Sequence, residues 1–211
     1  MESRQVFPLF YNGPVQYFSR LIREQQVILE QYDHYSKQTY RNRCRILGPN
    51  GVMVLSVPVK RTRGKKNLFR DIRIDTDTPW HRVHWKSMEA SYASSPYFVI
   101  VSEEFHRIYE KPPEFLVDLN MELLEAILAN LNLNISTSLS ESFNDTGGVD
   151  SPGRFIHPKQ DPLVSDPDFH PVQYHQVFSD RHGFQPNLSV LDLIFNQGPE
   201  SVSILDKCIR T

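Results

Sequence analysis

Cysteine is scarce in this chain of 211 residues, which contains two, Cys44 and Cys208. They lie far apart and form no Cys-x-x-Cys pair, so neither a disulfide framework nor a zinc-finger spacing is present. We therefore predict two buried thiols in a reducing compartment, with a disulfide or a metal role as the alternatives.

Long apolar stretches are also missing. No run of about 18 apolar residues occurs, so no segment is predicted to span a bilayer. The opening Met-Glu-Ser-Arg-Gln is not a basic segment followed by an apolar core, so no secretion signal is predicted. Together these absences predict a soluble, cytoplasmic protein.

Several catalytic signatures are absent as well. The turn after the first predicted strand has one glycine, Gly13, so no phosphate-binding loop is present. Neither a nucleophile elbow nor a Ser-His-Asp order is found. Motifs alone therefore reveal no catalytic machinery, and the cofactor stays unknown.

What the chain does have is an uneven distribution of charge. Residues 37–73 hold eleven of its 23 Lys and Arg but one acid, Asp71, which makes this stretch about +10. The formal net charge of the whole chain is −2, so the remainder carries near −12. A segment this basic is costly in self-repulsion unless it binds an anion or the acidic remainder folds over it.

The first half of the sequence alternates between strand-like and helix-like patterns. Apolar runs predict a strand–helix–strand opening, and Asn50-Gly51 predicts a β-hairpin turn between two further strands. The predicted strands cover residues 6–10, 27–29, 41–46 and 52–57, with a helix from residue 15 to 22 and a further short strand at 72–74. Between them, residues 60–70 are predicted to form a mobile basic loop.

Helical periodicity dominates the second half of the sequence. Helices are predicted from Thr78-Pro79 to before Pro96, at 103–110, from Pro113 through Leu131, at 188–195 and at 199–205. The Ser/Pro-rich residues 136–171 show no periodicity and are predicted to be one long irregular segment. The expected fold is a single α/β domain over residues 1–211, in which several helices flank a mixed sheet opened by the strand–helix–strand unit and its β-hairpin.

The most specific local pattern is the alternation of Arg41, Arg43 and Arg45. On a strand, alternate side chains point to one face, about 7 Å apart. Three guanidiniums in a line suit an oligo-anionic ligand such as a diphosphate, because each binds phosphate or carboxylate through paired donors. Lys37 extends this candidate site, and the basic loop at 60–70 is a candidate lid. The alternative is that the arginines pair with acidic groups of the C-terminal half.

Two titratable residues stand out on predicted helices. His81 and His84 are one turn apart, a spacing that allows a shared metal, but no third ligand fits, and we predict no metal site. His84 is a candidate proton carrier or ligand contact, or else a histidine at the edge of the core. Asp192 interrupts an apolar helix, so it must be paired. We expect a structural ion pair with Arg43 or Arg45, with a catalytic base as the alternative.

Several strings in fixed order resemble the WbqC-like protein family over nearly the whole chain. They are KQTYRNRCRI (37–46), LSVPVK (55–60), WHRVHW (80–85), ASY (90–92), SPYF (95–98), YEK (109–111), YHQVF (174–178) and GFQPNLSVLDLIFN (183–196). The resemblance implies a link to cell-surface polysaccharide (O-antigen) biosynthesis. It also implies transfer of an aminoacyl or acyl group onto an amino sugar, as suggested for some members.

The family pattern coincides with specific polar residues, including the arginine strand that the charge distribution indicates independently. These residues are Lys37, Asn42, Arg43, Arg45, His84, Tyr92, Asn187, Ser189, Asp192 and Asn196. Two departures are visible. Longer members begin with a Gln-Pro-aromatic motif, whereas this chain has Phe7-Pro8-Leu9-Phe10 without that Gln. Its Ser/Pro-rich segment stands where longer members carry a further α/β stretch.

The leading hypothesis is a transferase-like enzyme that binds a phosphorylated or nucleotide-linked sugar. In it Lys37, Arg43 and Arg45 hold phosphates, Asn42 and Asn187 orient the ligand together with Tyr92 and Asn196, and His84 or Asp192 moves a proton. One alternative is a non-catalytic partner in a polysaccharide assembly complex, with residues 136–171 as the interaction surface. The other is a nucleic-acid-binding module, disfavoured by the pI near 6.4.

Overall fold

A computed structural model of the chain describes residues 5–60, 67–144 and 155–210, and it has the α/β architecture expected. Most of the basic loop at 60–70, and residues 145–154 of the Ser/Pro-rich segment, lie outside the described residues. In chain order the elements are β1 (Gln5–Pro8), α1 (Val15–Leu21), β2 (Gln26–Glu30), β3 (Arg43–Gly48), β4 (Gly51–Ser56), η1 (Phe69–Asp71), α2 (Trp80–Tyr92), α3 (Phe98–Glu110), α4 (Leu116–Asn130), β5 (Ser136–Leu139), α5 (Pro162–Ser165), α6 (Ser179–His182), α7 (Val190–Gln197), η3 (Gly198–Glu200) and α8 (Ser201–Lys207).

The opening strand–helix–strand unit is confirmed. β1 and β2 are parallel, with Phe7 opposite Leu29, and α1 connects them. A third parallel strand, β5, pairs with β2 on its other side. β5 lies inside the segment predicted to be irregular, and that part of the prediction is wrong. Its sequence, STSL, is short and polar. It becomes a strand because the edge of β2 supplies hydrogen-bond partners for its backbone.

The hairpin forms a second, antiparallel sheet of β3 and β4, separate from the parallel one. Its turn residues are Pro49 and Asn50, and Gly51 opens β4 in the left-handed region with a φ of 105°. Glycine suits that backbone conformation because it has no Cβ. The strand expected at 72–74 makes only isolated bridges, including one between Val59 and Ile74.

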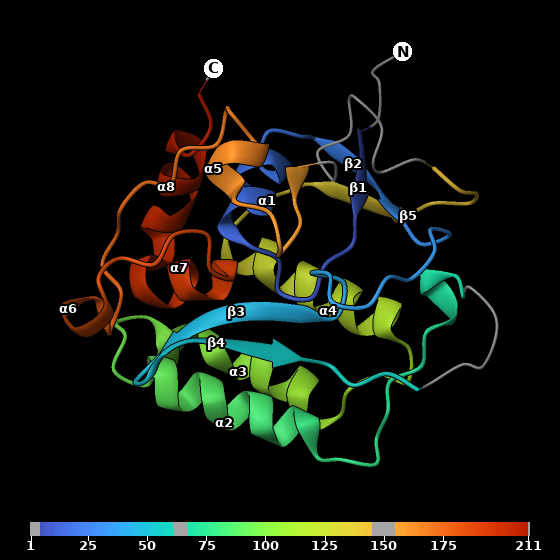
Figure 1. The fold of residues 1–211 in the computed structure, drawn as a ribbon, viewed down its shortest axis with the longest axis horizontal. Coiled ribbons are helices and arrows are strands. Elements are labelled where there is room, and N and C mark those ends of the chain that lie inside the picture. Colours follow the sequence, from blue (N-terminus) through green and yellow to red (C-terminus); the bar gives the residue numbers. More distant parts are fainter. Residues whose placement is uncertain (1–4, 61–66, 145–154, 211) are drawn as a thin grey trace.

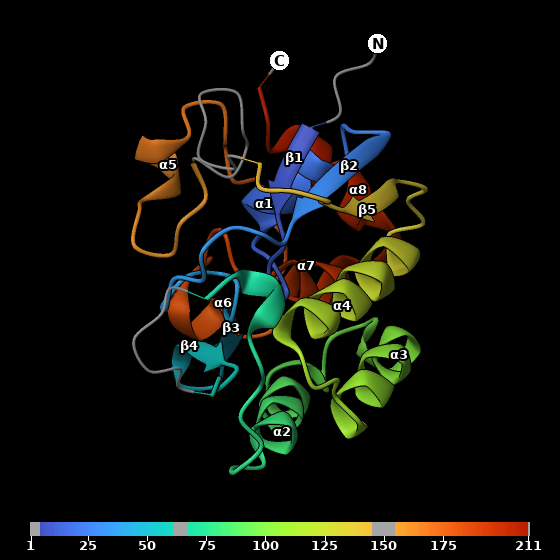
Figure 2. The same cartoon turned by 90° about the vertical axis from the view of Figure 1, so that its right-hand side faces the viewer.

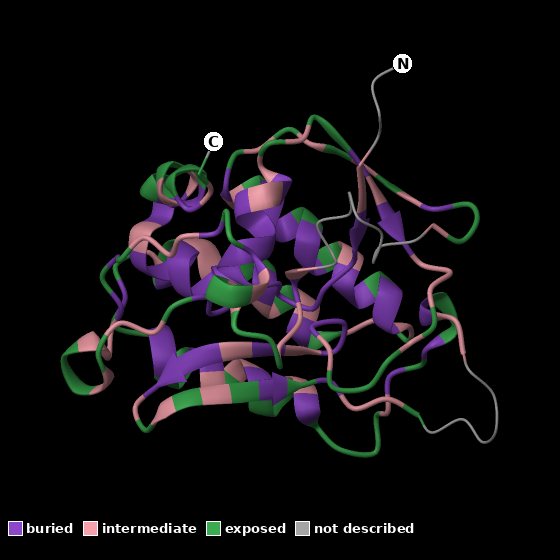
Figure 3. Cartoon of the chain, turned by 45° about the horizontal axis from the view of Figure 1, so that its top comes forward, coloured by how far each residue is buried: buried purple, intermediate pink, exposed green. Residues whose placement is uncertain are grey.

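The helices follow the predicted order but begin at different residues. α3 begins five residues before its predicted start, and α4 begins after Pro113, at Leu116. Figures 1 and 2 show α4 and α7 in the middle of the molecule, with the parallel sheet on one side and α2 and α3 on the other. Figure 3 shows these central helices largely buried. In the part of the chain that the structure describes, no helix has the length and apolar character needed to cross a membrane.

The core between α2, α3 and α7 is built around Phe195. Its ring lies 5.1 Å from those of Tyr92 and Phe98 and 5.9 Å from that of Phe105, measured between centroids. Gly198 ends α7, with a φ of 50°. Phe195 therefore joins a C-terminal helix to two helices from the middle of the chain.

Candidate functional site

Arg41 does not share a face with the other two arginines of the alternating motif. It precedes β3 rather than lying in it, and it is only 5% exposed. Its guanidinium forms an ion pair with Asp33 at 2.6 Å and lies over the ring of Phe69, 4.6 Å from the centroid. For Arg41, the expectation of a line of three anion-binding guanidiniums is wrong. Its pairing is structural, but with Asp33 of the N-terminal half rather than with an acid of the C-terminal half.

Arg43 and Arg45 behave differently. Both lie in β3, both are half-buried, and they share one face of the hairpin, while Cys44 and Ile46 are buried on the other face as predicted. Within residues 5–60, 67–144 and 155–210, neither arginine pairs with a carboxylate. The Nε of Arg43 is buried without a hydrogen-bond partner. Two partly desolvated cations are thus left without a carboxylate partner among the described residues.

Three further polar side chains are close enough for the charge of Arg43 or Arg45 to shift their pKa, and together the five form what we call the arginine site: Tyr35, Tyr40, Arg43, Arg45 and His157. Burial raises the pKa of Tyr35 to about 12, against the opposing charges of Arg43 and Arg41. Burial also raises the pKa of Tyr40, although the positive charge of Arg45 opposes this. Burial, then Lys159 and Arg43, lower the pKa of His157. Both phenols therefore stay protonated at neutral pH and can donate hydrogen bonds to an anion.

The other predicted ligand contacts near this strand have different roles. Asn42 donates from Nδ2 to the Val57 carbonyl at 2.9 Å, and its backbone carbonyl accepts from the Val57 N–H at 2.8 Å. It thereby fixes the chain at the start of β3. Lys37 is exposed in the loop before it. The structure thus brings Arg43 and Arg45 together, with Lys37 near them in sequence only.

Asn187 caps a helix from the other end of the sequence. Its backbone is left-handed, with a φ of 54°, and its side-chain Oδ1 accepts from the Gln16 N–H at 2.9 Å in the first turn of α1. The usual cap position of α1 is Pro14, which has no side-chain cap. Two residues after Asn187, the N–H of Ser189 donates to the Arg45 carbonyl at 2.8 Å. Residues 187–189 therefore tie α1 to the arginine strand.

We expect the substitution Asn187→Ala to lower the free energy of unfolding by about 1 kcal/mol, because it leaves the N–H of Gln16 without its cap. Urea denaturation would measure this loss. Asn134→Ala, which changes an exposed asparagine, is the matched control and should change stability by less than about 0.5 kcal/mol. Equal stability of the two variants would show that the cap contributes nothing.

His84 belongs to a buried chain of hydrogen bonds rather than to a surface site. Its Nδ1 contacts the Tyr11 hydroxyl at 2.7 Å, the two hydroxyls of Tyr11 and Tyr109 are 2.6 Å apart, and Asn12 Nδ2 donates to Tyr109 at 2.8 Å. Burial lowers the pKa of His84 to about 4, although a backbone hydrogen bond to Ser56 opposes the shift. The imidazole is therefore neutral at pH 7, and in the tautomer with the proton on Nε2 its Nδ1 accepts a hydrogen bond from the Tyr11 hydroxyl.

His81, the other histidine of the pair, hydrogen-bonds elsewhere. Its Nδ1 lies 2.7 Å from the Tyr109 carbonyl oxygen, so the two imidazoles of the predicted spacing have different partners.

Asp192 is buried at 1% exposure, and the expectation that it pairs with Arg43 or Arg45 is wrong. Its Oδ2 accepts from the Tyr174 hydroxyl at 2.7 Å and from Gln176 Nε2 at 2.9 Å. Burial raises its pKa to about 6, and hydrogen bonds from neutral neighbours only partly counteract this. These neutral donors bind only Oδ2, while Oδ1 is buried without a hydrogen-bond partner among the described residues, which agrees with the raised pKa of this acid.

Tyr92 and Asn196 lie beside this carboxylate. The Tyr92 hydroxyl affects the pKa of Asp192 without reaching good hydrogen-bond geometry, and Asn196 Nδ2 donates to the Asp192 backbone carbonyl at 2.7 Å. The candidate residues therefore fall into separate groups: the arginine site, the His84 chain and the Asp192 cluster. No sequence pattern marks Tyr11, Tyr109 or Gln176 as a partner of these groups, although Tyr109 and Gln176 lie in strings that carry the family resemblance.

The chain is thus an α/β protein with two half-buried arginines on one strand of its β-hairpin. The profile of the WbqC-like protein family matches residues 11–157, and the chain belongs to that family. It is also 28% identical over 216 residues to the uncharacterized protein Rv1507c of Mycobacterium tuberculosis (strain ATCC 25618 / H37Rv). This alignment covers 91% of this chain and 92% of that protein. No solved structure matches the chain. The profile match includes the arginine site and His84, whereas Asp192 lies beyond it.

Proposed function

We propose that this protein is a cytoplasmic, transferase-like enzyme of cell-surface polysaccharide biosynthesis. In this proposal the arginine site binds the phosphates of a phosphorylated or nucleotide-linked amino sugar. The reaction is transfer of an aminoacyl or acyl group, the activity that the family resemblance implies. Membership of the WbqC-like family and the charge state of the arginine site support this proposal.

One observation carries the binding half of the proposal. Arg43 and Arg45 are partly desolvated on one strand face and form no ion pair with a carboxylate in the described part of the chain. A guanidinium withdrawn from water without a counter-ion is unfavourable, and a diphosphate spanning two such groups relieves that cost through charge-assisted hydrogen bonds. The protonated hydroxyls of Tyr35 and Tyr40 supply further donors.

The proposal keeps a proton-transfer role for His84 or Asp192, but the burial of both side chains limits how they can act on a ligand. Their exposures of 4% and 1% leave almost no surface for direct contact with a ligand. Either group would act through the hydroxyl it contacts, Tyr11 for His84 and Tyr174 for Asp192. Both are therefore positioning residues in this conformation.

Calorimetric titration with a panel of nucleotide sugars tests the binding half. We expect at least one to bind the wild-type protein, and Arg43→Ala or Arg45→Ala to weaken it about tenfold to a hundredfold, since a hydrogen bond to a charged group contributes roughly 1.5–3 kcal/mol. Arg107→Ala, which changes an exposed arginine of α3 paired with Glu103, is the matched control and should bind like wild type. Unchanged affinity in both strand variants would refute the arginine site.

A further inference from the structure

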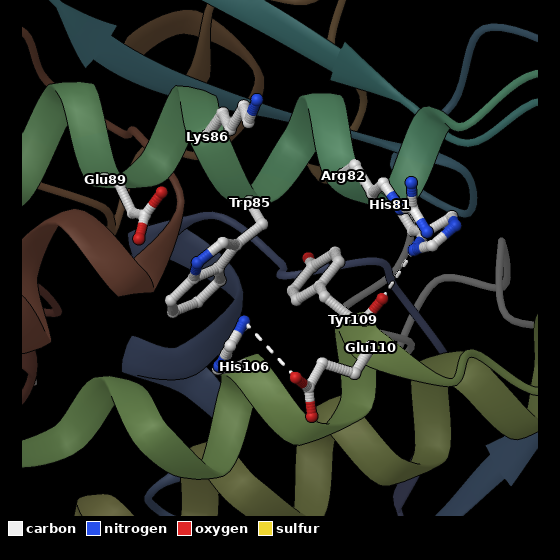
Figure 4. Close-up of a pocket in the computed structure, with 8 residues that line it drawn as sticks. All are labelled: His81, Arg82, Trp85, Lys86, Glu89, His106, Tyr109 and Glu110. Atoms are coloured by element: carbon white, nitrogen blue, oxygen red, sulfur yellow. Dashed lines mark hydrogen bonds and ion pairs between the residues drawn. The ribbon is translucent and has the colours of Figure 1, made fainter.

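A groove between α2 and α3 forms a second candidate site. Its volume is about 470 Å³, enough for a ligand of one or two sugar rings. Trp85 and Tyr109 point into it from the two helices, as Figure 4 shows. α2 separates the groove from the hairpin, because His84 faces the Ser56 backbone while Trp85 faces α3. The groove is therefore distinct from the arginine site.

A preorganised aromatic stack forms one wall of the groove. The Trp85 indole lies 4.5 Å from the imidazole of His106 at an interplanar angle of 29°, and 5.9 Å from the ring of Phe98 at 26°. These contacts hold the indole in one orientation, while the residue keeps part of its surface exposed. A fixed, partly open indole is a good platform for the C–H face of a sugar ring, because ordering it on binding costs little entropy.

The ends of the groove carry opposite charges. Figure 4 shows His81 and Arg82 at one end and Glu89 at the other. Arg82 and Glu89 are seven residues apart on α2, which corresponds to about 10 Å along the helix axis. Arg82 and the neighbouring Lys86 are exposed, and in the described ranges neither pairs with a carboxylate. One end therefore attracts an anion, and the other accepts hydrogen bonds from hydroxyl or amino groups.

We propose that this groove binds an acidic sugar of one or two rings, with its carboxylate or phosphate at Arg82 and Lys86. A ring lies against Trp85, and Glu89 and Glu110 accept hydrogen bonds from its hydroxyl groups. This assignment uses none of the arginine-site residues, so it stands or falls separately from the proposed function.

Calorimetric titration of the full chain with four probes tests the assignment. Glucuronic acid and glucose 1-phosphate should bind, at least one of them below about 10 mM, and neutral glucose should bind at least about tenfold more weakly. Affinity should fall as salt is added, because Arg82 and Lys86 are exposed to screening. If neither acidic sugar binds, if glucose binds equally well, or if uridine monophosphate binds while both acidic sugars do not, the assignment is wrong.

Exposed substitutions locate the binding. Arg82→Ala and Lys86→Ala should each weaken the acidic sugar about fivefold to tenfold, and Trp85→Leu should weaken it further if circular dichroism shows an intact fold. Arg107→Ala on α3, outside the groove, should leave this affinity unchanged. Glucuronic acid carries no phosphate, so it distinguishes the groove from the arginine site. Glucuronic acid binding that survives Arg82→Ala together with Lys86→Ala, or that disappears with Arg43→Ala, would overturn the proposal.

Discussion

Replacing Phe195 with alanine should lower the free energy of unfolding by about 3–5 kcal/mol, the usual loss when a large buried ring is deleted from a core. The ring is fully buried and contacts Tyr92, Phe98 and Phe105 from two other helices. Because these neighbours belong to two separate helices, α2 and α3, they cannot all collapse into the space left behind. Equilibrium denaturation in urea measures the change.

Phe143→Ala provides the matched control. Its ring is 60% exposed, so its removal should change stability by less than about 0.5 kcal/mol. A loss below about 1 kcal/mol for Phe195→Ala would mean that this cluster does not hold α7 against α2 and α3.

Asp192→Asn should change how stability depends on pH. The folded protein raises the pKa of this carboxyl from 3.8 to about 6, so the folded state favours the protonated acid. Its stabilising effect is complete below about pH 4 and disappears as pH rises through about 6. A shift of about two units corresponds to roughly 3 kcal/mol as an upper figure, since each unit is about 1.4 kcal/mol.

The measurement is the difference in unfolding free energy between the variant and the wild type. Asparagine keeps an oxygen for Tyr174 and Gln176 and carries no charge, so the variant should gain stability relative to wild type between pH 4 and pH 7. Other titrating groups cancel in this difference. A flat difference across that range would show that the carboxylate is not penalised by burial.

Local sequence patterns predicted the strand–helix–strand unit, the hairpin and the order of the helices. These features depend on signals within a few residues, such as Asn50-Gly51 and the alternation of Arg43 and Arg45 with Cys44 and Ile46. The prediction failed at Arg41 because the strand begins two residues later, at Arg43, so the alternation of strand side chains does not extend back to Arg41. It failed at β5 because a short polar strand is specified by its neighbour β2 and not by its own composition.

The polar interior was harder to anticipate. A buried carboxylate at position 192 indicated a partner, and the expected partner was a cation, but the neutral donors Tyr174 and Gln176 bind its Oδ2 instead. The His84 chain joins residues from the first turn after β1 with residues of α2 and α3, between 73 and 98 positions apart. The periodicity of the sequence does not predict contacts between residues so far apart. The expectation of one domain over residues 1–211 stays a prediction.

The contacts of residues 187–189 with Gln16 and Arg45 bear on how fragments of this chain should be chosen. The family profile ends at residue 157. A protein cut there would lose Asn187, which caps α1, and Ser189, which donates a hydrogen bond to the Arg45 carbonyl in β3. A boundary drawn by sequence similarity thus separates parts of the chain that are hydrogen-bonded to each other. Truncations meant to isolate the ligand-binding half should keep the chain through α8.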